Sequence, residues 1–110
     1  MPVEVTQIGM LHSLLAGFME LTSIPDNIGD IEGLQKLYLP NNKLSSIPAS
    51  IGQLSDLETL NLKKNNITSL PESIRNCTKL KKLTLTGNPI SPEEMEKIKQ
   101  WVPDKCKIKN

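Results

Sequence analysis

The residue types that perform covalent chemistry are sparse in this sequence of 110 residues. It has one histidine, His12, and two cysteines, Cys77 and Cys106, which form no CxxC motif. A nucleophile–base pair, or a zinc site built on two histidines, would need more of these side chains. We therefore expect no catalytic residues, no metal site and no cofactor. The simplest interpretation of the two cysteines is buried free thiols.

The charged residues are distributed unevenly along a chain whose composition is typical of one folded domain. Apolar residues make up 37% and charged residues 23%, and no apolar run is long enough to cross a bilayer. Residues 1–34 hold five acidic residues and no Lys or Arg, whereas residues 63–110 hold eleven basic residues against five acidic ones. We expect one acidic end and one basic end.

Three of the lysines alternate close to the C-terminus, at Lys105, Lys107 and Lys109. One interpretation is structural, because charge along a terminal edge strand discourages pairing with a second sheet. A second interpretation is binding to an acidic partner. Nucleic acid is a third and weaker one, since Arg75 is the only arginine and no aromatic residues interleave with the lysines.

The elements that must position these side chains recur every 23 residues. Segments that begin at Leu34, Leu57 and Leu80 share, in whole or in part, the pattern L-x-x-L-x-L-x-x-N-x-[LI]-x-x-[LI]-P-x-x-I. The paired leucines alternate as a short strand with one buried face requires. The asparagine falls where the chain must turn, and its amide can bond backbone groups there. Because no repeat can bury its own leucines, the repeats must stack.

This pattern resembles the leucine-rich-repeat family, in the variant whose second half carries Leu/Ile-Pro-x-x-Ile. The resemblance covers nearly the whole chain and implies an α/β solenoid with a parallel concave sheet. Residues 91–106 also resemble the closing segment of several bacterial leucine-rich-repeat proteins. We expect one domain over residues 1–110, with a half repeat at 1–10, repeats at 11–33, 34–56, 57–79 and 80–102, and a terminal strand in 103–110.

The apolar stretch "IGMLHSLLAGFM", residues 8–19, fits the pattern as a degenerate first repeat. In that alignment Ala16 replaces a leucine and Met19 replaces the asparagine. The apolar residues at 11, 14, 15, 18 and 19 also follow the spacing of an amphipathic helix. A capping helix is therefore the alternative, although Gly9 and Gly17 disfavour it.

The same stretch could be mistaken for the apolar part of an export signal. Such a signal needs a basic flank, whereas the flanking charge here is Glu4. We therefore expect a cytoplasmic protein that is not embedded in a membrane. The alternative is export by a route without a cleavable N-terminal signal.

Beyond Asn88 the chain departs from the repeat. Ser91 suits an N-cap, Pro92 suits the first helical position, and Glu94 completes a capping box. We expect a capping helix that closes the core with one apolar face, formed by Met95, Ile98, Trp101 and Val102. Past this helix the register places Cys106 in line with Leu83, which predicts a last strand with Cys106 facing the core.

The family resemblance implies that ligands bind the concave face, where the non-leucine residues of each strand point outward. We expect partner contacts from Leu15, Lys36, Tyr38, Thr59, Asn61, Lys63, Lys82 and Thr84. An exposed Tyr adds contact area at little entropic cost, so Tyr38 is the best single anchor.

The strands alone offer a small binding surface. Five strands about 4.8 Å apart give a sheet about 20 Å wide, and its area is smaller than the ~800 Å² per partner of a standard interface. A partner must therefore also contact the flanking loops, or bind weakly, unless the chain is part of something larger.

Together these features predict a non-enzymatic protein–protein interaction module. Catalytic domains of the bacterial leucine-rich-repeat ligases have no counterpart in this sequence. The alternative is a structural fragment of a longer repeat protein, or a piece that self-associates through residues 11–20. An exposed apolar edge strand would favour such pairing.

Overall fold

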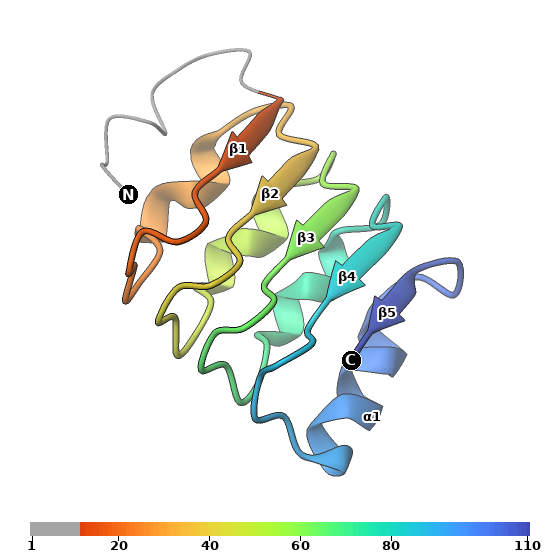
Figure 1. Cartoon of the computed structure of the whole chain (residues 1–110). Helices are drawn as coiled ribbons and strands as arrows, with labels where there is room; N and C mark the ends of the chain where they lie inside the picture. The colour runs from red at the N-terminus through yellow and green to blue at the C-terminus, as the bar shows by residue number, and fades with distance from the viewer. Residues whose placement is uncertain (1–11) are drawn as a thin grey trace.

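The computed structural model describes residues 12–110, and within them five parallel strands form one sheet in chain order (Figure 1). The strands are β1 (Ser13–Leu15), β2 (Lys36–Tyr38), β3 (Thr59–Asn61), β4 (Lys82–Thr84) and β5 (Lys107–Lys109). The returning segments carry three 3-10 helices, η2 (Asp26–Asp30), η3 (Ala49–Gln53) and η4 (Glu72–Asn76), and the helix α1 (Pro92–Trp101). All four helices lie behind the sheet in Figure 1. The expected α/β solenoid with a parallel sheet and a C-terminal capping helix is confirmed.

A ladder of buried leucines holds the central strands together. Leu37, Leu60 and Leu83 are aligned across β2, β3 and β4, and each is 0% exposed. Each lies in the middle of a three-residue strand, so the residues on either side of it face outward. Stacking therefore buries one residue per strand and leaves two on the concave face.

Strands β2, β3 and β4 each end in a turn that an asparagine side chain stabilises. Asn65 is buried, and its Nδ2 donates to the carbonyl oxygens of Leu39 at 2.9 Å and Leu62 at 3.0 Å. Its Oδ1 accepts from the backbone N–H of Leu44 at 3.1 Å. The amide thus bonds backbone groups at the turn, as the sequence predicted, and it also reaches backbone groups of the preceding repeat. Asn42 and Asn88 make equivalent bonds.

The 3-10 helices on the convex side pack at close range. Each follows a proline, and each buries one isoleucine against the leucine ladder, namely Ile28, Ile51 and Ile74. Gly52 is needed for this approach, because a Cβ built there would lie 2.5 Å from the carbonyl oxygen of Ser73. The convex side is therefore tightly stacked from η2 to η4.

The first repeat forms a strand rather than a capping helix. Ser13 and Leu15 of β1 pair in parallel with Lys36 and Tyr38 of β2. Asn42 compensates for the missing asparagine at position 19, because its Oδ1 accepts from the backbone N–H of Met19 at 3.0 Å. From residue 12 onward, the structure thus confirms that this segment is a degenerate first repeat. The predicted half repeat at 1–10, and residue 11, lie outside the described residues.

The C-terminal helix forms as predicted, but the predicted register of the last strand is wrong. Ser91 Oγ accepts from the backbone N–H of Glu94 at 3.2 Å, which caps α1. Lys107, and not Lys105, pairs with Lys82, and Ile108 pairs with Leu83. The helix α1 has ten residues where the other repeats have five-residue 3-10 helices, and it rises only about 1.5 Å per residue. The return to the sheet therefore takes two more residues than the repeat period allows.

This shift also corrects the expected position of Cys106. The residue precedes β5 and is only half-buried, whereas the sequence placed it beside Leu83 in the core. Cys77 is fully buried at the position that Leu54 holds in the preceding repeat, as expected.

Candidate partner-binding face

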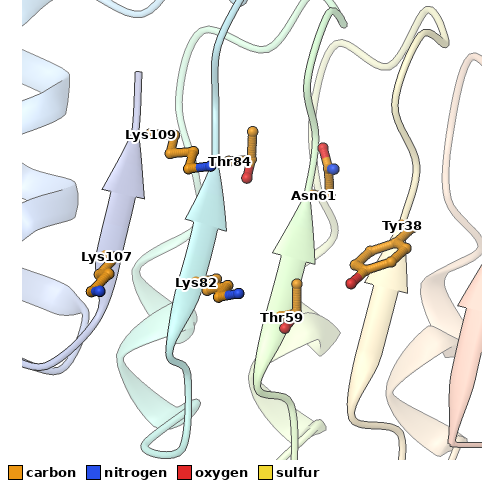
Figure 2. A pocket seen from close by; sticks show the side chains of 7 residues that line it. All are labelled: Tyr38, Thr59, Asn61, Lys82, Thr84, Lys107 and Lys109. Carbon is orange, nitrogen blue, oxygen red and sulfur yellow. The ribbon is translucent and has the colours of Figure 1, made fainter.

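The outward-facing residues of four strands surround a hollow of about 180 Å³ on the concave face (Figure 2). It spans β2 to β5 and is lined by Tyr38, Thr59, Asn61, Lys82, Thr84, Lys107 and Lys109. The strand register explains why these residues meet. Lys82 lies beside Lys107, and Thr84 lies beside Lys109, on adjacent strands.

The lining of the hollow consists largely of hydrogen-bond donors. Lysine ammonium groups donate only, and the hydroxyl groups of Tyr and Thr can donate. The Oδ1 atom of Asn61 already accepts from the backbone N–H of Lys63 at 3.0 Å, so its Nδ2 is left to donate. No Asp or Glu lines the hollow. Chemically, this surface suits groups that accept hydrogen bonds or carry negative charge.

Five lysines outside the hollow pair with carboxylates. Among the described residues, Lys36, Lys63, Lys64 and Lys105 form no ion pair. Lys79 Nζ lies 2.7 Å from Asp56 Oδ1, and the hydrogen bond to Asp56 raises the pKa of Lys79. Further pairs join Lys43 to Glu20, Lys81 to Glu58, Lys97 to Glu94 and Lys99 to Glu96. Within residues 12–110, the three lysines that line the hollow form no ion pair.

The structure brings together five of the eight residues expected to bind a partner. These are Tyr38, Thr59, Asn61, Lys82 and Thr84. Leu15, Lys36 and Lys63 are exposed but do not line the hollow. Their participation in binding, like that of the other five, remains a prediction.

Lys107 and Lys109 belong to the hollow, although the expected site residues did not include them. The sequence alignment placed them two residues away from their observed register, and the edge-strand interpretation gave them a structural role. Their alternation with Ile108 was the available signal, because it indicates a strand with one outward face. The observed return path from α1 was needed to align that face with β4.

The cysteines lie away from the hollow. Cys77 Sγ lies 3.3 Å from the carbonyl oxygen of Ile51, and burial raises the pKa of this thiol to about 11. Burial also raises the pKa of Cys106. A thiol held protonated is a poor nucleophile, so neither position is an activated cysteine.

Two other kinds of feature are absent from the described residues, a metal-binding cluster and a membrane-spanning helix. From residue 12 to residue 110, no group of three His, Cys, Asp or Glu side chains is placed to hold a metal ion. In the same part of the chain, no helix has the length and apolar character needed to span a bilayer.

Large apolar side chains are exposed at the opposite end of the sheet from the lysines. Leu15 is 66% exposed, Phe18 is 78% exposed and Met19 is 56% exposed. They lie on β1 and in the turn that follows it. This apolar edge, residues 15–19, is a second surface to be explained.

The chain is similar in sequence and in structure to known leucine-rich-repeat proteins. The family model described as "Leucine rich repeat" matches residues 32–90. The solved structure of the Leptospira interrogans LRR protein LIC12759 is 41% identical, with a TM-score of 0.97 over 100% of this chain and 28% of that one. No curated protein sequence matches the chain.

Plant receptors provide two further structural matches. The LRR ectodomain of the receptor kinase SOBIR1 from Arabidopsis thaliana is 30% identical, with a TM-score of 0.62 over 70% of this chain and 44% of that one. The plant peptide hormone receptor RGFR1, solved in complex with RGF2, is 28% identical, with a TM-score of 0.79 over 99% of this chain and 18% of that one. In all three comparisons the chain spans less than half of the longer protein.

Proposed function

Because the chain belongs to the leucine-rich-repeat family, we propose that it is a non-enzymatic module that binds a protein partner. The binding surface is the concave face together with the adjoining loops. Leucine-rich-repeat folds commonly mediate protein–protein interaction. The observation that carries the proposal is the hollow between β2 and β5, which is lined by polar side chains that the fold does not need for its core.

The neighbouring proteins support this proposal by analogy. One of them is a peptide hormone receptor solved in complex with RGF2, and it shares the fold along nearly the whole of this chain. Half-buried Tyr38 supplies a rigid amphipathic contact at the β2 end of the hollow. The lining has no acid, no histidine and no cysteine, so it provides no nucleophile–base pair for catalysis.

The loops extend the binding surface beyond the narrow sheet. The residues after β2 and β3 turn through positive φ angles at Asn41 (57°) and Lys64 (54°), directly next to the hollow. Lys63 is exposed at the start of the second of these turns. A partner that contacts both the strands and these turns gains the area that the strands alone do not offer.

An affinity pull-down with the purified chain tests the proposal. The double variant Tyr38→Ala/Lys82→Glu should lose the partner, because it removes the anchor and reverses one charge of the hollow. The matched control is Lys99→Glu on the outer side of α1, which should retain the partner. Circular dichroism establishes that all three proteins are folded. Retention of the partner by the folded double variant would refute concave-face binding.

The exposed apolar edge favours a second candidate function, namely self-association or continuation of a longer repeat protein. Leu15, Phe18 and Met19 would be covered by a neighbouring repeat or by a second copy of the chain. If the chain dimerises through residues 11–20, Leu15→Lys should produce a folded monomer in light scattering. A monomer at high concentration whose residues 11–20 resist hydrogen exchange would reject self-association.

We also propose a cytoplasmic location, which the two unpaired thiols support. Export by a route without a cleavable N-terminal signal is the alternative. Fractionation of the source cells, followed by immunodetection of the chain, distinguishes the two locations.

A further inference from the structure

We propose that the occupant of the hollow is an extended acidic segment of the partner protein, about four to six residues long. Its carboxylates would lie over Lys82, Lys107 and Lys109, and its less polar end would lie against Tyr38. This inference rests on the proposed function and adds the chemical class and the shape of what is bound.

The clustering of lysines without an ion pair carries the first step. Among residues 12–110, seven lysines have no carboxylate within 4.0 Å, at positions 36, 63, 64, 82, 105, 107 and 109. Three of these seven, Lys82, Lys107 and Lys109, line the same hollow. Clustered like charges repel one another, and no acid of the lining offsets that repulsion. An acidic ligand would supply the missing negative charge.

Protection of the sheet edge does not account for this cluster. Lys107 and Lys109 lie on β5, where charge could serve that purpose. Lys82, however, lies on β4, which is paired with β3 on one side and β5 on the other. A lysine on the outer face of an internal strand has no edge to protect, so edge protection accounts for only two of the three lysines of the hollow.

The other lining residues add donors for the backbone of a bound peptide. Asn61 Nδ2 remains to donate because its Oδ1 is occupied by the N–H of Lys63. The hydroxyls of Thr59 and Thr84 can donate to carbonyl oxygens and accept from N–H groups. In Figure 2 the side chains of Lys82 and Lys109 extend from their strands toward the β3 side of the hollow. The donors and the positive charges therefore face the same space.

Dimensions favour an extended segment over a folded surface. The hollow crosses three inter-strand steps, from β2 to β5, or about 14 Å at about 4.8 Å per step. An extended peptide that rises about 3.3 Å per residue covers that distance with four or five residues. Lys82 and Lys107 lie on adjacent strands along this path, so carboxylates of the crossing peptide can face both of them.

The test uses fluorescein-labelled hexaglutamate as the probe and labelled hexaglutamine as its uncharged control, followed by fluorescence anisotropy. The chain should bind hexaglutamate and not hexaglutamine, and added salt should weaken the binding. Each exposed lysine is expected to contribute roughly two- to fivefold, so Lys82→Gln/Lys109→Gln should weaken binding roughly four- to twenty-fivefold. The matched control Lys97→Gln/Lys99→Gln carries the same change of charge on α1 and should change binding less than twofold.

Amide chemical shifts locate the bound probe independently of the variants. The shifts should change at residues 59–61, 82–84 and 107–109. Equal weakening by both double variants, or shifts spread over α1, would show non-specific attraction and overturn the proposal. Tighter binding of labelled hexauridylate to the same lysines would overturn it in favour of nucleic acid. A dimer that Lys82→Gln dissociates would overturn it in favour of a second copy of the chain.

The pull-down separates this inference from the proposed function. Release of the captured partner by unlabelled hexaglutamate supports both. If Tyr38→Ala/Lys82→Glu loses the partner while hexaglutamate neither binds nor releases it, concave-face binding stands and the acidic segment is refuted. If the folded double variant keeps the partner, the proposed function itself is refuted.

Discussion

Two sets of residues lie one position apart on the same strands and differ in almost every physical respect. Leu37, Leu60 and Leu83 form a continuous ladder that is 0% exposed. Their immediate neighbours Tyr38, Asn61 and Thr84 are half-buried and line the hollow. Because strand side chains alternate in direction, a three-residue strand separates buried core side chains from outward-facing ones. The leucine ladder and these outer residues should therefore respond differently to substitution.

The largest effect is expected in the leucine ladder. Leu60→Ala should lower the free energy of unfolding by roughly 2–5 kcal/mol, because it opens a cavity between two aligned leucines. Urea denaturation measures the change, with exposed Lys63→Ala as the control that should be nearly silent. A larger loss from Lys63→Ala than from Leu60→Ala would mean that the division between the two sets is wrong.

The asparagine turns should come next. Asn65→Ala should lower the free energy of unfolding by roughly 1–3 kcal/mol, since it leaves the buried carbonyl oxygens of Leu39 and Leu62 without their donor. The control is Asn66→Ala, at the exposed residue beside it. Denaturant melts that find less than about 0.5 kcal/mol for Asn65→Ala would show that water replaces the amide at little cost.

The labelling rates of the two cysteines test the difference between buried and partly exposed positions in the unmutated protein. Native Cys106 should react with iodoacetamide at least about tenfold faster than Cys77, a ratio that corresponds to about 1.4 kcal/mol. Cys77 is buried, and its pKa of about 11 keeps the thiol protonated, so its labelling should accelerate as the pH rises toward that value. Mass spectrometry resolves the two sites, and both should react equally fast in denaturant. Equal rates in the native protein would contradict the burial of Cys77.

The smallest effect on stability is expected for the residues proposed to bind. Lys82→Gln should change the free energy of unfolding by less than about 0.5 kcal/mol, because its side chain is exposed and forms no ion pair among residues 12–110. Neighbouring Leu83→Ala is the matched contrast and should resemble Leu60→Ala. A marked loss of stability in Lys82→Gln would show that the outer residues also hold the fold together.

Sequence reasoning was most reliable where the repeat was regular. The strand positions of Leu37, Leu60 and Leu83 and the turn role of Asn65 followed from a period of 23 and from elementary backbone hydrogen bonding. Around residues 11–19 the spacing admitted both a strand and a helix. Pairing of Ser13 with Lys36 resolved the choice, because the neighbouring repeat offers β1 a ladder that an isolated segment lacks.

Part of the proposed site lay beyond the reach of sequence reasoning. Tyr38, Thr59, Asn61, Lys82 and Thr84 could be assigned to one face by alternation alone. Lys107 and Lys109 could not be aligned with them, because their register depends on the path that α1 takes across the convex side. The same path decided that Cys106 packs against the core only half-buried.

By itself the sequence indicated the family, the stacking of the repeats, the core residues of the regular repeats and the outward face of each regular strand. These properties follow from local periodicity, which a repeat imposes in the same way on every copy. Only the tertiary structure decided which charged residues meet. Lys82, Lys107 and Lys109 share one hollow because a ten-residue α-helix replaces a five-residue 3-10 helix and returns the chain to the sheet two residues late.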